Sequence, residues 1–299
     1  MGLTQNFVEW LDSNGYGEFD FKREDLIGGS FGGKESASEK ISHQPVVFIH
    51  GNSDIVVGDT YWQTGFTESI EYFMAQGYSK GELYATTWGD GNKDHDYTRI
   101  HDFDTLHRLR KFFEAVLAYT GAEKIDVITH SMGVTLGRKI LKGGRLVGDE
   151  QGRSLGAPLN HHVDTFVGIC GANLGLVNCY SFADMLPTCN AVNGYYPGTS
   201  DSSDMAAYMK DLQEDPTREG DNTFSIFSTA DDLIGFGDVV WGAYTSQFAT
   251  QDGYVMKTSY EYGHIATRDL TKDQQYDLVT KHQTAELNHG LATPDSATQ

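Results

Sequence analysis

IDVITHSMG (residues 125–133) is the stretch that decides the fold. Residues 125–129 form a short apolar and β-branched run, which is typical of a buried strand. Residues 132–141 have the composition and spacing of a helix, and Ser131 falls on the turn between the two. The stretch therefore predicts a strand, a sharp turn and a helix in immediate succession.

The alternation of strand and helix continues on both sides of this stretch. Further strands are expected at 45–50, 83–88, 165–171, 223–229 and 253–260, and further helices at 61–76, at 102–119 and from 271. This order predicts an α/β fold with a mostly parallel central sheet and helices on both faces. We assign residues 45–290 to that domain.

Three regions depart from the alternating pattern. Residues 1–44 are interpreted as an N-terminal extension packed on the core, with a short helix around Phe7 and a flexible Gly-rich loop at 28–34. Residues 173–222 show no clear element, and so long an insertion is usually functional or disordered. It could form a cap over a site. Residues 291–299 are expected to be a loose tail.

Composition excludes several classes of protein. The 299 residues include 42 acidic and 22 basic side chains, a formal net charge of −20. Such a surface repels phosphate backbones and anionic lipid, so we expect no nucleic-acid partner. The sequence has no run of about 18 apolar residues, so we expect no stable membrane insertion.

The turn at Ser131 has the context of a nucleophile elbow, in which a strained turn exposes a serine hydroxyl above a sheet. Gly133 would let the departing helix pack closely. Thr129 stands where the usual G-x-S-x-G pattern has its first glycine, and that position needs a small side chain. The alternative is an ordinary strand–helix turn with a capping serine.

A serine nucleophile that attacks a carbonyl group needs backbone N–H donors for the oxyanion that forms. Met132, directly after the nucleophile, is one expected donor. The strand ending at His50 leads into Gly51 and Asn52, and Asn52 is the expected second donor. For the His50 side chain we favour a structural hydrogen bond.

The general base and the acid should follow the nucleophile along the chain. Of His264, His282 and His289, only His264 lies in a predicted loop between the last strand and the last helix, so we choose it as the base. Asp231 follows the strand at 223–229 and would orient that imidazole. Asp232 is the adjacent rival.

Cysteines and the remaining histidines raise the question of disulfides and metals. Cys179 and Cys189 could form a short disulfide, or all three thiols could be free. Cys170, in an apolar run, is expected to be a small core residue. Two histidines flank acidic residues, His95 and His101, and two more form the doublet His161-His162. None of them has the spacing of metal ligands, so no catalytic metal is predicted.

Four segments resemble a known family. PVVFIHGNSD (45–54), IDVITHSMGV (125–134), GICGANLGL (168–176) and STADDLI (228–234) look like the class 2 lipases of nematodes and the small lipases of bacilli, which have the α/β-hydrolase fold. The segment from Asn178 to Cys189 also looks like the secreted polyhydroxybutyrate depolymerases related to those lipases. Thr129 and the longer 173–222 insertion depart from the bacillus pattern.

The resemblance implies a secreted serine ester hydrolase without metal or organic cofactor. It implies the triad Ser131, Asp231 and His264, the oxyanion donors Asn52 and Met132, and a Cys179–Cys189 disulfide. The expected partner is a small ester, lipid or polyester substrate, and the chain is expected to be a monomer.

Three functions are weighed: a lipase or esterase, a polyester depolymerase, and a hydrolase fold that only binds. A depolymerase would need an apolar platform. The aromatic residues that could form it are Tyr195, Tyr196, Tyr208, Trp241, Tyr244 and Phe248, and they could equally be ordinary core residues.

Overall fold

A computed structural model describes residues 1–294 and contains a nine-stranded sheet in the order β1-β2-β6-β3-β7-β8-β9-β12-β13. The strands of this sheet are β1 (Gly2–Leu3), β2 (Ser30–Gly32), β3 (Val46–Ile49), β6 (Leu83–Thr86), β7 (Ile125–His130), β8 (Val163–Ile169), β9 (Asn222–Ser228), β12 (Gly253–Lys257) and β13 (Asn288–His289). The central run from β6 to β12 is parallel throughout, as the alternating pattern predicts.

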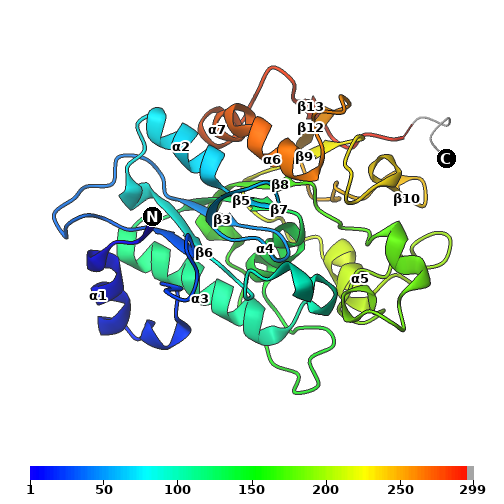
Figure 1. The fold of residues 1–299 in the computed structure, drawn as a ribbon, viewed down its shortest axis with the longest axis horizontal. Coiled ribbons are helices and arrows are strands. Elements are labelled where there is room, and N and C mark those ends of the chain that lie inside the picture. The colour runs from blue at the N-terminus through cyan, green and yellow to red at the C-terminus, as the bar shows by residue number, and fades with distance from the viewer. Residues whose placement is uncertain (295–299) are drawn as a thin grey trace.

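Helices cover both faces of the sheet (Figure 1). They are α1 (Gln5–Ser13), α2 (Thr67–Ala75), α3 (Phe103–Thr120), α4 (Met132–Lys142), α5 (Ala207–Glu214), α6 (His264–Leu270) and α7 (Lys272–Lys281). Helices α1, α3, α4 and α5 share one apolar core with the sheet, whereas α2 and α7 share another. Two separate cores, one on each face, are what a sheet buried on both sides requires.

The N-terminal extension is part of the sheet. Strand β1 pairs with β2, and β2 pairs antiparallel with β6. The prediction of a flexible loop at 28–34 is therefore wrong, because tertiary pairing makes a strand of a Gly-rich segment with no strand propensity of its own. Helix α1 forms around Phe7 as expected, with Phe7 and Leu11 buried.

The helix expected at 61–76 is shorter than predicted. Strands β4 (Val57–Thr60) and β5 (Gln63–Gly65) form a hairpin, and α2 starts only at Thr67. Tyr61 and Trp62 lie exposed at the hairpin tip. Phe66, Ile70 and Phe73 do pack into the core at helical spacing, but Phe66 precedes the first helical turn.

The 173–222 insertion contains helix α5, which sequence patterns did not indicate. Its buried residues Tyr208, Met209 and Leu212 belong to the core under α4.

Two small strands outside the main sheet, β10 (Val239–Val240) and β11 (Ala243–Tyr244), follow β9. At the C-terminus, Ala292 exchanges two hydrogen bonds with Gln247, which ties the start of the expected tail to the body. The rest of that tail, 295–299, lies outside the described residues.

No helix in the described part of the chain is both long and apolar enough to cross a bilayer.

Candidate active site

Ser131 occupies a strained turn between β7 and α4. Its φ of 55° and ψ of −127° lie in a region that costs a non-glycine residue about 1–3 kcal/mol. The turn is held because the Ser131 N–H donates to the Ile169 carbonyl at 2.8 Å. A Cβ at Gly133 would lie 2.4 Å from the Ile49 carbonyl oxygen, so only glycine lets α4 leave the turn this close to β3.

Thr129 is accommodated by a second glycine. Its side chain is fully buried, and its hydroxyl donates to the Val167 carbonyl at 3.0 Å. A Cβ at Gly137 would lie 3.0 Å from the Thr129 γ-methyl, closer than most real contacts. The larger residue at the elbow is thus matched by the absence of a side chain on the facing helix.

The structure brings His264 and Asp231 together. The His264 Nδ1 lies 2.6 Å from Asp231 Oδ2, and both side chains are buried. The other Asp231 oxygen, Oδ1, accepts the backbone N–H groups of Leu233 at 2.9 Å and Ile234 at 2.7 Å. Because a carboxylate can only accept, Nδ1 carries the proton and Nε2 is free to accept one.

The groups around Asp231 favour the ionised form of its carboxyl group. Burial raises the pKa of its carboxyl group, but the neighbouring His264 and the Leu233 and Ile234 N–H groups outweigh burial. The net pKa lies below the ordinary value for aspartate. The carboxylate is therefore charged when it orients the imidazole.

Asp232 has a different partner from Asp231. It is exposed, and its Oδ1 accepts the main-chain N–H of His264 at 2.8 Å. His264 is the first residue of α6 rather than a loop residue, so this N–H is one of the donors that a helix start leaves unpaired. Asp231 is therefore the residue hydrogen-bonded to the His264 imidazole, whereas Asp232 is hydrogen-bonded to the His264 backbone.

The loop at Gly51 lies directly against the nucleophile. A Cβ at Gly51 would lie 2.8 Å from the Ser131 Cβ, so a side chain there would displace the loop. Asn52 follows, and its side-chain amide donates to the Asp96 carbonyl at 2.9 Å. Met132 starts α4, where backbone N–H groups lack partners within the helix. The assignment of both N–H groups as oxyanion donors stays a prediction.

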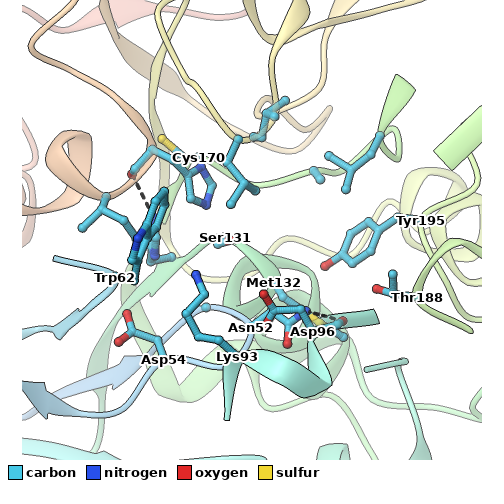
Figure 2. A pocket seen from close by; sticks show the side chains of 18 of the residues that line it. Asn52, Asp54, Trp62, Lys93, Asp96, Ser131, Met132, Cys170, Thr188 and Tyr195 are labelled. Carbon is cyan, nitrogen blue, oxygen red and sulfur yellow. Dashed lines mark hydrogen bonds between the residues drawn. The ribbon is translucent and has the colours of Figure 1, made fainter. Parts of the chain in front are cut away.

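One cavity of about 230 Å³ is lined by Gly51, Asn52, Ser131, Met132 and His264 (Figure 2). Figure 2 shows Ser131 between Trp62 on one side and Tyr195 on the other, with the Lys93 amine pointing into the space. The remaining wall is largely apolar. Its residues include Tyr97, Ala172, Leu176, Leu233, Ile234 and Ile265.

The 173–222 insertion supplies one wall of this cavity. The expected disulfide between Cys179 and Cys189 is present, and Leu176 and Thr188, beside its two ends, line the cavity. The Tyr195 hydroxyl is hydrogen-bonded to Thr135 of α4 at 2.8 Å. The insertion is thus fixed to the helix that follows the nucleophile.

Most of the six aromatic residues considered for a polymer platform are core residues, which is the alternative to an exposed platform. Tyr195, Tyr208, Tyr244 and Phe248 are buried, and Tyr196 is half-buried. Of the six, only Trp241 is exposed, because Tyr195, Tyr208 and Phe248 belong to the core on which the insertion packs and Tyr244 packs on Phe227. The exposed aromatic residues that line the cavity are instead Trp62 and Tyr97.

The other histidines have protein partners. The His50 ring stacks on Trp88 and accepts its backbone N–H at 3.1 Å, a structural role as expected. His95 Nδ1 contacts Asp90 at 2.5 Å. His101 is buried between the Asn193 carbonyl and the Thr135 hydroxyl, both at 2.8 Å. In the doublet, His161 is exposed, whereas His162 is half-buried and its Nδ1 lies 3.0 Å from the Glu123 carbonyl oxygen.

The sequence did not indicate that Cys170 lies in the cavity wall. The residue is fully buried as expected, but it lines the cavity and has a φ of 49°. Its thiol, an Asp231 carboxylate oxygen and a His264 ring nitrogen lie within 4.8 Å of one another. Burial, with Asp231 close by, raises the pKa of the thiol well above its usual range. No local signal distinguishes such a cysteine from a core residue.

The parallel sheet and the strained serine turn define an α/β hydrolase. A model of the family described as lipase (class 2) matches residues 43–277, and the chain belongs to that family. Membership of that family makes it a carboxylic ester hydrolase of the lipase and esterase type.

Solved structures share the fold. Lipase B of Aspergillus fumigatus is 13% identical with a TM-score of 0.52, over 83% of this chain and 53% of that protein, so this chain spans about half its length. The mature lipase BlEst2 of Bacillus licheniformis is 14% identical with a TM-score of 0.51, over 81% of this chain and 96% of that protein. At such low identity these likenesses show the fold alone.

Proposed function

We propose that this chain hydrolyses acylglycerols or short-chain carboxylic esters through an acyl-enzyme on Ser131. The observation that carries the proposal is the Asp231–His264 pair, which directs the Nδ1 proton to Asp231 and leaves Nε2 as the ring nitrogen that can accept a proton, in a protein whose Ser131 lines the same cavity. An imidazole held by a carboxylate in the same cavity as a serine is the arrangement that activates a hydroxyl.

The reaction proceeds in two halves. The Ser131 hydroxyl oxygen attacks the ester carbonyl carbon while its proton passes to His264. The N–H groups of Asn52 and Met132 stabilise the resulting oxyanion, a contribution of about 2.7–4 kcal/mol for each donor. The tetrahedral intermediate then breaks its bond to the alcohol oxygen, which leaves with the proton from His264.

Water completes the cycle. It attacks the acyl carbonyl and gives its proton to His264, and the bond to the Ser131 oxygen breaks as that proton returns to it. Asp231 stays ionised throughout and stabilises the imidazolium that forms in each half.

Cavity size favours a short acyl chain. The cavity of about 230 Å³ is smaller than the roughly 300–1,000 Å³ typical of pockets for drug-sized ligands. We infer that acids of a few carbons fit best. The disulfide supports an oxidising, extracytoplasmic location, because such bonds seldom persist in the cytosol. We also propose that the protein acts as a monomer.

A chain-length panel tests this proposal. The value of kcat/KM should be highest for p-nitrophenyl butyrate and tributyrin and should fall for octanoate and palmitate esters. Ser131→Ala should abolish turnover of all of them. Faster hydrolysis of a polyhydroxybutyrate film than of tributyrin would favour the depolymerase instead. An inactive wild type would favour a binding protein.

A further inference from the structure

A buried cluster of Arg268, His130 and Asp54 joins the segments that carry the proposed catalytic groups. Arg268 lies on α6, four positions after His264, and is fully buried. Its Nη1 donates to Asp54 Oδ2 at 2.6 Å and lies 3.3 Å from the His130 Nδ1. One guanidinium therefore contacts the loop of Asn52 and the residue that precedes the nucleophile.

His130 links the elbow to the base. Its Nε2 lies 3.1 Å from the main-chain carbonyl oxygen of His264. A carbonyl can only accept, so Nε2 carries the ring proton and Nδ1 is left to accept from Arg268. Burial and the positive charge of Arg268 hold the pKa of His130 well below its usual range, so the ring stays neutral. The ring thus spans from the guanidinium to the backbone of the proposed base.

Asp54 links the same guanidinium to the oxyanion loop. Its Oδ1 accepts the backbone N–H groups of Ile55 at 2.8 Å and Gly65 at 3.2 Å. Arg268 also donates to the Thr64 hydroxyl and, through Nε, to Asp269 at 2.8 Å. The loop, strand β5 and helix α6 therefore share one set of charge-assisted hydrogen bonds.

A single arginine in this place can set the distance between nucleophile, base and oxyanion donors. Its planar guanidinium offers donors in a fixed fork, so it holds its partners at defined angles. Misplacement of reacting groups by about 1 Å can lower a rate by about 10²-fold. We propose that Arg268 is a positioning residue for ester hydrolysis, acting through His130 and Asp54. This inference rests on the proposed function.

The test compares Arg268→Met and Arg268→Lys with the wild type. Active sites are first counted with diethyl p-nitrophenyl phosphate, and kcat and KM for p-nitrophenyl butyrate are then expressed per titrated site. Arg268→Met should lower kcat per site about 10²-fold and change KM less than about threefold. Arg268→Lys keeps the charge and should recover part of the loss.

A matched control separates positioning from stability. Arg110 on α3 is also buried and pairs with Glu114, but it lies outside the cavity lining. Arg110→Met should reduce the yield of titratable sites at most and should leave kcat per site unchanged. A wild-type kcat per site in Arg268→Met would overturn the proposal.

A second variant covers the case in which Arg268→Met fails to fold because Asp54 is left as a buried unpaired charge. The double variant Asp54→Leu/Arg268→Met removes both charges together. It should fold and show the same loss per site, and a wild-type rate per site would contradict the proposal. A different result would contradict the proposed function itself: turnover of the ester by Ser131→Ala with Arg268 intact.

Discussion

The substitution Asp231→Asn tests the orientation of the base most sharply. Asp231 Oδ1 accepts two backbone N–H groups, so an asparagine must place its carbonyl oxygen there. The amide nitrogen then occupies the position 2.6 Å from the His264 Nδ1. An amide nitrogen can only donate, so Nδ1 must become the acceptor and the ring proton must move to Nε2.

The expected effect of this tautomer change is large. With a proton on Nε2, His264 cannot accept the hydroxyl proton of Ser131. The same substitution in a serine protease triad lowers kcat by about 10⁴-fold, and we expect a loss of that order with little change in KM. Shape and volume are conserved, so the protein should still fold.

Steady-state kinetics with p-nitrophenyl butyrate at neutral pH measures the effect, and Asp232→Asn is the control. Asp232 only accepts the main-chain N–H of His264, and an amide oxygen can do the same. The kcat of Asp232→Asn should fall by less than about tenfold. The reasoning is refuted if Asp231→Asn keeps a tenth of the wild-type kcat or if Asp232→Asn is the more damaging change.

Three further predictions concern packing, pH and thiols. Gly137→Ala should lower the free energy of unfolding by about 1–3 kcal/mol in urea titrations, because its Cβ meets the Thr129 γ-methyl, and Thr129→Ser should relieve that loss. Burial raises the pKa of Glu82, but the N–H groups of residues 79, 43 and 42 lower it to about 2. The carboxylate therefore contributes about 3 kcal/mol to the free energy of unfolding above pH 5, and this contribution is lost as the pH falls toward 2. Glu82→Gln should flatten the pH dependence of the urea midpoint. An aromatic disulfide reagent should find no reactive thiol in the native protein and one after unfolding without reductant, because Cys170 is buried and the other cysteines are bonded.

Local sequence patterns predicted much of the fold and identified several residues of the candidate site. Strand β7, the turn at Ser131 and helix α4 follow from an apolar run, a break and a helical spacing, all within one short segment. Asp231 and His264 could be placed because residues after parallel strands meet at one edge of the sheet.

The rest depends on contacts distant in sequence. Strand β2 exists because β6 lies beside it, and the β4–β5 hairpin takes up the first residues of the helix expected at 61–76. The sequence at Tyr208 or Phe248 does not show whether the ring is exposed or which residues cover it, so a surface platform and a core position are equally open from the sequence, and the structure shows the core position. Arg268 meets Asp54 across 214 positions, and no motif connects the two.

Covalent trapping of the nucleophile tests the central claim most directly. The protein is treated with a fluorophosphonate, its intact mass is measured, and the modified peptide is sequenced by mass spectrometry. We predict one adduct per chain, located on Ser131, formed in parallel with loss of esterase activity and absent in Ser131→Ala. Full inactivation with the adduct on another residue, or an active enzyme that takes up no label, would contradict the account.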